Sequence, residues 1–295
     1  MVRSPMTPAF SLRPPTPDDL EALARIAFEA FVKINGQHGF PPDFPSMDVP
    51  RGLFGMLLSS DHVRGVVAHQ NGAAVASGFL WLGNDGIGGI GPVTVDPAAQ
   101  AVGVGKAVMT SLLEVAQQEG CAGVRLVQAG FNTTSISLYS KLGFDVREPL
   151  ACMNGEPSAD AVDGLDVRPA TEGDIPACNA ICQAVHGHHR EQDLRFGLMT
   201  GSARVVVRKS DGKITGYASD IGFFGHAAAP SNREMMALIG TVAQITGPGV
   251  LIPTRNGELF RWCLASGLRV VQPMTLMSRG TYNEPVGSFC PSILF

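Results

Sequence analysis

A ten-residue pattern near the start of the chain recurs after its midpoint, and it constrains the fold more than any other feature. Residues 11–20 and 166–175 share an Arg-Pro pair, a threonine and an aspartate at the same spacing. In both copies a short strand ends at the proline, which cannot continue a β ladder. The threonine then caps a helix with acidic residues in its first turn. We therefore expect one fold to be present twice.

The ends of the two copies also match. Residues 132–146 and 256–270 each begin with an asparagine and continue as an amphipathic helix, a glycine and an apolar strand. Glycine tolerates the positive φ that often follows a helix. Residues 153–164 are rich in Asn, Gly, Pro, Ser and Asp, which predicts a linker. A chain of 295 residues is long enough for two ordinary domains, so we predict domains at 1–153 and 164–295.

The predicted elements of the first domain follow a mixed α/β (α+β) order and not a strict βαβα repeat. We expect strands at 63–69, 73–82, 90–95, 124–128 and 144–147, and helices at 18–32, 53–58, 105–119 and 134–142. Asn71-Gly72 predicts a hairpin turn between the first two of these strands. Each domain is expected to be a mixed, mostly antiparallel sheet flanked by helices.

Composition excludes several classes of protein. The formal net charge is −4 and no dense run of Lys or Arg occurs, so we expect no nucleic-acid partner. No apolar stretch reaches the length of a membrane span, and the N-terminus lacks a secretory signal, so no membrane association is expected. The six cysteines form no C-x-x-C pair, which indicates reduced thiols without a disulfide framework and a cytoplasmic location.

Residues 93–107 carry the strongest chemical signal. A strand ends at Asp96-Pro97, and a turn containing Gly103 and Gly105 leads into an amphipathic helix. The first N–H groups of a helix have no partner within it, and glycines leave room for a ligand to approach them. Such a turn can bind a pyrophosphate through backbone N–H groups and the helix dipole.

Two other phosphate-binding motifs do not fit. Gly105-Lys106 does not complete a Walker A motif, because Gln100 stands where a glycine is needed and Ala107 replaces the Ser or Thr that holds magnesium. Residues 86–91 match G-x-G-x-x-G, but they precede a strand, whereas the dinucleotide fingerprint joins a strand to a helix. We expect a flexible hairpin or a bulge at 86–91.

Two motifs together resemble one family. Gln100-x-x-Gly103-x-Gly105 resembles the Q/R-x-x-G-x-G/A acetyl-CoA signature of the GNAT (GCN5-related N-acetyltransferase) superfamily. Residues 132–144, Asn-x-x-Ser-x-x-Leu-Tyr-x-Lys-x-Gly-Phe, resemble the second motif of that family at its usual distance downstream. The motifs cover 93–146, and the repeat extends the resemblance more weakly to the second half. The whole chain resembles a tandem two-domain GNAT protein.

The resemblance implies acetyl-CoA as a co-substrate and no metal. The strand backbone would pair with the pantetheine arm, and the N–H groups of the following turn would bind the pyrophosphate. Asn132 would hydrogen-bond the pantetheine, and Tyr139 would face the sulfur as the general acid. The implied cofactor-binding residues are Val93, Thr94, Val95, Gln100, Val102, Gly103, Val104, Gly105, Lys106, Ala107, Asn132 and Ser135.

The proton transfers of acetyl transfer set further requirements. A leaving thiolate has a pKa near ~8.5 and a phenol near ~10, so Tyr139 can protonate the thiolate as the C–S bond breaks. An alkyl ammonium, with a pKa near ~10.4, must lose a proton before it attacks. The strand at 90–95 lacks the glutamate that supplies this base in many relatives. Asp85, His38, His62 or a chain of water molecules are the alternatives.

Structural roles compete with several of these assignments. Tyr139 can simply pack on the sheet, Asn132 can act only as a helix cap, and Lys106 can be a solvated helix residue. The run His186-x-His188-His189 suggests a metal site, but no matching Cys, Asp or Glu cluster lies nearby in the sequence, so we favour a polar loop. The proline-rich segment 40–45 can pack or can line the acceptor pocket, and we favour lining.

The second domain lacks the glycines of the first. Residues 229–235, Ala-Pro-Ser-Asn-Arg-Glu-Met, stand where the first domain has its glycine turn, and Cys263 stands where Tyr139 stood. Bulky and polar residues in place of glycine would block a pyrophosphate. We therefore expect a structural role for this domain, or a role as one wall of the acceptor pocket.

Taken together, the sequence predicts an acetyl-CoA-dependent N-acetyltransferase that transfers the acetyl group directly to a small-molecule amine. Two alternatives stay open. One is a protein that binds or senses acyl-CoA without turnover, which the missing glutamate favours. The other is a protein or peptide N-acetyltransferase, which needs an open peptide groove. Whether the chain is a monomer or a homodimer also stays open, because the second domain can replace a partner subunit.

Overall fold

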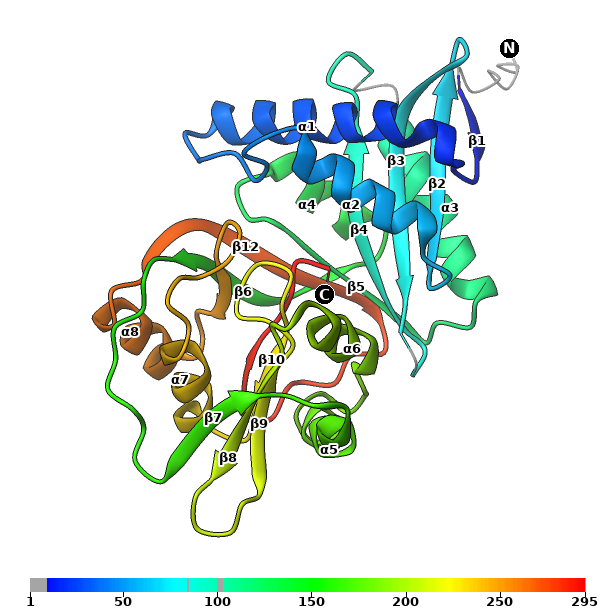
Figure 1. Cartoon of the computed structure of the whole chain (residues 1–295). Coiled ribbons are helices and arrows are strands. Elements are labelled where there is room, and N and C mark those ends of the chain that lie inside the picture. The colour runs from blue at the N-terminus through cyan, green and yellow to red at the C-terminus, as the bar shows by residue number, and fades with distance from the viewer. Residues whose placement is uncertain (1–9, 84, 100–102, 295) are drawn as a thin grey trace. The chain divides into compact units, whose positions relative to one another are not determined.

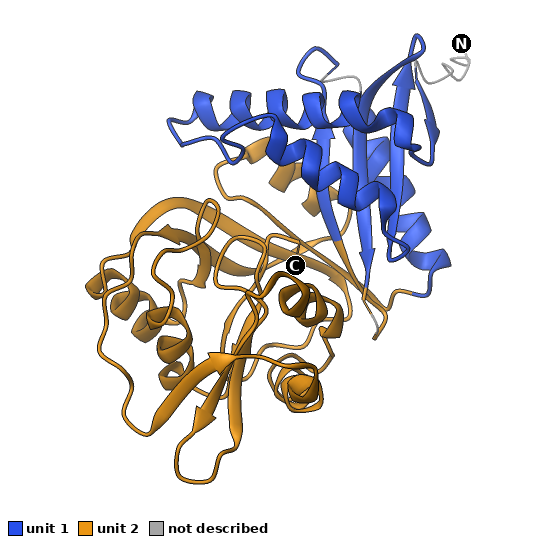
Figure 2. Ribbon diagram, in the orientation of Figure 1, with its two compact units in different colours: residues 1–82, 90–120 blue, residues 83–89, 121–295 orange. Residues whose placement is uncertain are grey.

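The computed structural model describes residues 10–83, 85–99 and 103–294. The chain forms two compact units, which are coloured separately in Figure 2. The first unit contains residues 1–82 and 90–120, and the second contains 83–89 and 121–295. The boundary expected between 153 and 164 thus lies inside the second unit. The division into two repeated domains therefore remains a prediction.

The first unit is a sheet with helices on both faces. Its strands run in the order β1-β2-β3-β4, and β2 and β3 pair antiparallel. Helices α1 and α2 bury Leu23, Ile26 and Phe54 against one face. On the other face α3 packs closely against β3. The approach at Gly78 leaves no room for a side chain, because an added Cβ would lie 2.7 Å from Leu112 of α3. The elements are β1 (Ser11–Arg13), α1 (Leu20–Gln37), α2 (Asp48–Ser59), β2 (Val63–Gln70), β3 (Ala73–Leu82), β4 (Ile87–Val95) and α3 (Val104–Gln118).

Three predictions about this unit are settled by the strands. Asn71 and Gly72 have φ values of 51° and 81°, as the predicted hairpin turn requires. Strand β3 has the expected bounds. Strand β4 begins three residues earlier than expected, and Gly88 and Gly89 pair parallel with β5. The prediction of a flexible hairpin or bulge at 86–91 is wrong for these residues, because the missing side chains do not prevent ladder pairing.

The second unit contains two sheets. In one, the start of β4 is followed by β5, β12, β6 and β11, and in the other the order is β13-β10-β9-β8-β7. Its strands are β5 (Gly123–Ala129), β6 (Asp145–Asn154), β7 (Leu165–Pro169), β8 (Arg204–Arg208), β9 (Ile214–Ala218), β10 (Ala227–Ala229), β11 (Val250–Pro253), β12 (Arg269–Gly280) and β13 (Ser288–Cys290). Its helices are α4 (Thr133–Lys141), α5 (Ile175–His186), α6 (Glu191–Thr200), α7 (Asn232–Gly240) and α8 (Gly257–Ala265).

The last strands of the two sequence repeats are exchanged within one sheet. Strand β12 lies between β5 and β6, and β6 lies between β12 and β11 (Figure 1). All of these pairings are antiparallel. Strand β12 of the second repeat pairs with β5 and β6 of the first, and β6 of the first repeat pairs with β11 and β12 of the second. The two halves of the sequence therefore share part of their hydrogen-bonded framework.

The predicted repeat is confirmed in atomic detail at its two starts. Arg13 donates two hydrogen bonds to Asp19, both 2.8 Å long, and Arg168 donates two to Asp174, 2.7 and 2.8 Å long. In each copy the threonine and the aspartate also form a capping box. The shared residues of the pattern thus build the same strand-to-helix connection twice.

Candidate functional site

The start of helix α3 offers backbone donors to an anion. Gly103 precedes the helix with a φ of 81°, and no side chain among the described residues caps the first turn. That turn has no acidic residue, and Lys106 is exposed within it. The helix dipole and the free N–H groups therefore favour a negatively charged group at this end. The predicted residues Gln100 and Val102 lie outside the residues that the structure describes.

A surface depression of about 400 Å³ lies beside this turn. It is bordered at one end by Gly103, Lys106 and Ala107, which belong to the predicted cofactor-binding set, and at the other by Glu114. An anionic ligand would be favoured near Lys106 and disfavoured near the Glu114 carboxylate. The charge distribution therefore directs phosphate groups to the helix start.

The side chains at the end of β4 are held inside the first unit. The Thr94 side chain is buried, and its hydroxyl lies 3.1 Å from that of Ser77. The N–H of Asp96 donates to the Val75 carbonyl, and the parallel ladder between β4 and β5 ends at Gly89. Past that point, within the part of the chain that the structure describes, the backbone of the predicted residues Val93, Thr94 and Val95 does not pair with β5. It is the part of the strand that a ligand can use.

In the second unit, α4 fixes Tyr139 firmly. The tyrosine is 7% exposed, and its ring centroid lies 6.1 Å from that of Phe144. Burial raises the pKa of the phenol to about 12, and a hydrogen bond with the Ser135 side chain acts in the opposite direction. The phenol is therefore protonated at neutral pH, which is the form that a proton donor needs.

Asn132 is a helix cap, as its alternative structural role predicted. Its side-chain oxygen accepts a hydrogen bond of 3.1 Å from the backbone N–H of Ser135 at the start of α4. The cap holds the residues of the second motif in one rigid turn. A direct contact of Asn132 or Ser135 with a cofactor stays a prediction.

The three candidate bases have different surroundings. Asp85 accepts a hydrogen bond from the backbone N–H of His189, and its carboxylate lies 3.1 Å from the Nδ1 atom of that histidine. His38 has its Nδ1 atom 2.9 Å from the Ile34 carbonyl, and the backbone N–H of His62 donates to Ser60. All three are exposed. None of these contacts singles out one residue as the base.

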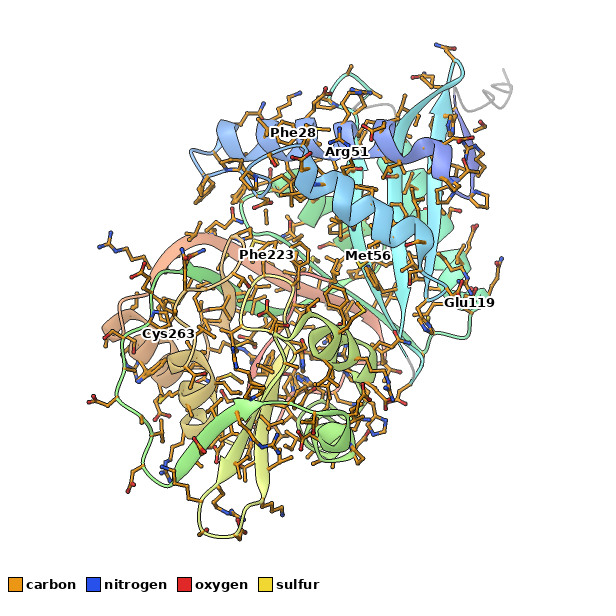
Figure 3. All side chains as sticks on the ribbon, viewed as in Figure 1. Phe28, Arg51, Met56, Glu119, Phe223 and Cys263 are labelled. Carbon is orange, nitrogen blue, oxygen red and sulfur yellow. The ribbon has the colours of Figure 1, made fainter. Side chains whose placement is uncertain are left out.

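The second repeat has a closed helix start at the position that corresponds to α3. Ser231 caps α7 by accepting a hydrogen bond from the N–H of Arg233, and its hydroxyl donates to Glu234. The side-chain amides of Asn232 and Asn256 hydrogen-bond to each other at the starts of α7 and α8. Cys263, labelled in Figure 3, is fully buried in α8, and burial raises the pKa of its thiol to about 12.

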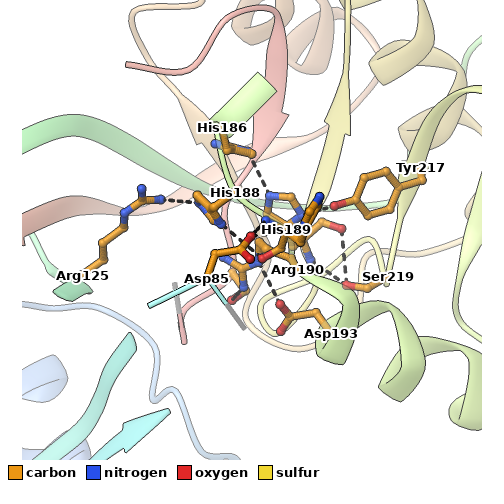
Figure 4. Close-up of polar contacts among 11 residues, drawn as sticks. Asp85, Arg125, His186, His188, His189, Arg190, Asp193, Tyr217 and Ser219 are labelled. Atoms are coloured by element: carbon orange, nitrogen blue, oxygen red, sulfur yellow. Dashed lines mark hydrogen bonds and ion pairs between the residues drawn. The ribbon is translucent and has the colours of Figure 1, made fainter. Parts of the chain in front are cut away.

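The predicted polar loop at 186–189 is instead a largely buried network (Figure 4). His186 and His188 are each 3% exposed, and burial lowers the pKa of both, to about 3 for His188. The Nε2 atoms of His186 and His226 lie 3.0 Å apart. Arg125 donates to Nε2 of His188 over 2.9 Å. His186 ends α5, whereas His188 lies in the loop between α5 and α6, as predicted. The burial of both rings was not expected, and it arises because partners distant in the sequence hold them inside the fold.

No three His, Cys, Asp or Glu side chains within 10–83, 85–99 and 103–294 are grouped so that they could hold a metal ion. The six cysteines are free, and Cys178 and Cys182 lie on the buried face of α5. Among the helices that the structure describes, none has the length and apolarity to cross a membrane.

The proline-rich segment 40–45 has a packing role at one of its residues. Phe44 is 6% exposed, and its ring meets that of Phe31 edge-on at 5.2 Å. The Asn35 side chain donates to the Pro41 carbonyl over 2.7 Å. Phe44 thus belongs to the core of the first unit, and an acceptor-lining role for the rest of the segment stays a prediction.

Glu148 is a buried charge that the sequence reading did not single out. It is 3% exposed on β6 and forms a salt bridge with Arg255, which lies 107 positions further along the chain. Sequence offers one weak signal, a lone acidic residue just before the buried run 150–153 of a strand. Its partner can be found only from the fold.

Comparison with known proteins gives a family match over part of the chain. Residues 21–144 match the model of the acetyltransferase (GNAT) family. The chain is 35% identical over 74 residues to the mycothiol acetyltransferase of Renibacterium salmoninarum, and 34% identical over 90 residues to the glucosamine 6-phosphate N-acetyltransferase of Trypanosoma brucei brucei. These matches span only 22% and 59% of the two relatives.

A solved structure covers nearly the whole chain. A Pyrococcus horikoshii protein assigned as an acetyltransferase superposes with a TM-score of 0.71 at 18% identity, over 95% of this chain and 92% of its own. At this identity the likeness establishes the fold alone. It extends that fold to the second half, which the family match does not reach.

Proposed function

Starting from the GNAT-family domain at residues 21–144, we propose that the protein transfers the acetyl group of acetyl-CoA directly to the amino group of a small molecule. The observation that carries the proposal is the open start of α3, where Gly103 leaves the first N–H groups without a side-chain cap among the described residues. The corresponding helix α7 is capped by Ser231. The two repeats thus differ at the feature that a diphosphate requires.

In the proposed reaction, the N–H groups of residues 103–107 bind the diphosphate of acetyl-CoA, and Lys106 adds a positive charge. The backbone of 93–95 binds the pantetheine arm, and a strand N–H polarises the thioester carbonyl. Attack of a neutral amine forms the C–N bond and places negative charge on that carbonyl oxygen, which a fixed N–H stabilises. As the C–S bond breaks, the thiolate receives a proton from Tyr139. The nitrogen releases one proton as it becomes an amide nitrogen, and this proton restores the phenol, so that no net proton is consumed.

A small acceptor is supported by the names of the two relatives that match part of the chain. Both carry the name of an acetyltransferase for a small molecule, mycothiol in one and glucosamine 6-phosphate in the other. We also propose that the repeats at 1–153 and 164–295 have different roles, the first in cofactor binding and the second in structure or in the acceptor site. The capped start of α7 supports this division.

The proposal is tested by incubating the purified full chain with acetyl-CoA and a panel of small primary amines, and by measuring released CoA together with acetylated product. We expect turnover of at least one amine. Calorimetry with CoA alone separates the alternatives. Binding of CoA without turnover of any amine supports an acyl-CoA-binding protein, which the lack of an acidic residue at 90–95 favours. If the chain neither binds CoA nor acetylates any amine, both interpretations are contradicted.

A further inference from the structure

One of the two carboxylate oxygens of Glu148 forms no hydrogen bond with the described residues. Its Oε2 atom accepts hydrogen bonds from Nε and a terminal nitrogen of Arg255, at 2.9 and 2.6 Å. Its Oε1 atom is buried and has no hydrogen-bond partner among the residues that the structure describes. Burial of an oxygen of an ionised carboxylate without a hydrogen bond is unfavourable, so such an atom points to a ligand that donates.

The Tyr282 hydroxyl is the second polar group in this position. Two guanidinium groups lie over the Tyr282 ring, Arg125 at 5.1 Å and Arg147 at 4.9 Å from its centroid. The phenolic oxygen is buried and lacks a hydrogen-bond partner within the described part of the chain. Because the ring already contacts these two cations, the hydroxyl is the group through which Tyr282 can bind something else.

The two groups belong to one charged cluster. A terminal nitrogen of Arg255 lies 2.6 Å from the Glu148 carboxylate and 3.4 Å from that of Glu284, two residues after Tyr282. Arg147, which precedes Glu148 in β6, lies over the Tyr282 ring, and burial raises the pKa of the phenol to about 12. Arg125 also donates a hydrogen bond to His188, which belongs to the buried histidine network. The side chains of Arg255 and Glu284 are 58% and 64% exposed, so the cluster reaches the surface at that edge. These two side chains therefore form the solvent side of the cluster.

The chemistry of the two atoms selects the ligand. An ionised carboxylate only accepts hydrogen bonds, so an anionic group would be repelled by Glu148, whereas a primary amine has N–H groups for both oxygens. We propose that Glu148 Oε1 and the Tyr282 hydroxyl bind the amino group of the acceptor. This inference rests on the proposed acetyl transfer. The nearby guanidinium groups disfavour a second positive charge, which favours the neutral amine that attacks the thioester.

Two conservative substitutions test the site. Glu148→Gln removes the carboxylate charge with little change in shape, and Tyr282→Phe keeps the ring between the arginines but removes its hydroxyl. For Glu148→Gln we expect the KM for the amine to rise by roughly 10- to 100-fold, the loss of a hydrogen bond to a charged group. For Tyr282→Phe we expect a rise of roughly 2- to 10-fold, the loss of a hydrogen bond between neutral groups. The KM for acetyl-CoA should be unchanged. Asp211→Asn, which removes the carboxylate of an exposed arginine pair of the second unit outside the cluster, is the control and should leave both KM values unchanged.

Direct binding separates failure of this site from failure of acetyl transfer. With CoA present, glucosamine 6-phosphate and its hydroxyl analogue glucose 6-phosphate are compared by calorimetry, and ethanolamine serves as a smaller amine probe. We expect the amines to bind more tightly than the hydroxyl analogue, and Glu148→Gln to abolish the difference. If amines bind in this way but none is acetylated, the site stands and the proposed function is overturned. If an amine is acetylated and both variants keep its KM, or if no amine binds, the site is overturned.

Discussion

Asp174 accepts hydrogen bonds from two nitrogens of Arg168, at 2.7 and 2.8 Å, while the same carboxylate caps the turn that starts at Thr171. Hydrogen bonding from Arg168 is the main reason why the pKa of Asp174 lies well below its usual range. The same pair in the first unit, Arg13 and Asp19, shows that this contact belongs to the repeated fold and not to one site. It predicts how stability depends on pH.

Replacement of Asp174 by asparagine should lower the free energy of unfolding by about 2 kcal/mol at pH 7, since a capping contact and a charged hydrogen bond are both weakened. A lowered pKa in the folded state means that the stabilisation is present above the unfolded value near ~3.9 and is lost as the pH falls towards the folded value. The difference between Asp174→Asn and wild type should therefore shrink below about pH 4. Urea titrations at pH 7 and pH 3 measure this difference in the free energy of unfolding. An equal difference at the two pH values would contradict the lowered pKa of Asp174.

Much of the first unit can be predicted because its signals are local. The spacing from Arg13 to Asp19 gives the strand-to-helix connection, and Asn71-Gly72 gives the hairpin. The insertion of β12 between β5 and β6 could not be predicted in this way, since it joins residues as far apart as Gly123 and Gly280. The same holds for the Glu148–Arg255 contact. Local patterns report turns, caps and strand ends, whereas strand order is decided by packing across the whole chain.

Charge reversal at the start of α3 should weaken CoA binding. Lys106 is exposed beside Gly103 at one end of the surface depression. Lys106→Glu places a carboxylate where the phosphates are proposed to bind, and we expect the Kd for CoA to rise roughly 10-fold at low salt and less at 0.5 M salt. The change is measured by calorimetry with the full chain. Lys209→Glu, an exposed lysine of the second unit, is the control and should not change the Kd.

Loss of the Tyr139 hydroxyl should slow transfer without loss of cofactor binding. Tyr139→Phe keeps the packing against Phe144 and removes the proton donor, so we expect kcat to fall roughly 100- to 1,000-fold with the Kd for CoA unchanged. Because the pKa of Tyr139 is raised to about 12, its proton is retained as the pH rises, and kcat of the wild type should show no alkaline decline up to pH 10 from this group. A variant with wild-type kcat would remove Tyr139 from the mechanism.

The chain should bind one CoA and not two. The start of α7 is capped by Ser231, whose hydroxyl donates to Glu234, and Asn232 and Asn256 are hydrogen-bonded to each other beside it. A diphosphate would meet the Glu234 carboxylate and a cap that already occupies the Arg233 N–H, in contrast to the start of α3. Calorimetric titration with CoA should therefore give a stoichiometry of one per chain. Two equivalent sites would mean that the second repeat is also a cofactor domain.

Neither half of the sequence should fold alone, although the repeat predicts two domains. Strand β12 pairs with both β5 and β6, so a fragment of residues 1–155 would lose the strand that joins them and would expose two unpaired edges. A fragment of residues 156–295 would lose β6 from between β11 and β12. We expect each fragment to be insoluble or unfolded by circular dichroism, and the two to be recovered as a soluble complex when expressed together. A cooperatively folding fragment 1–155 would show that the exchanged strands are dispensable.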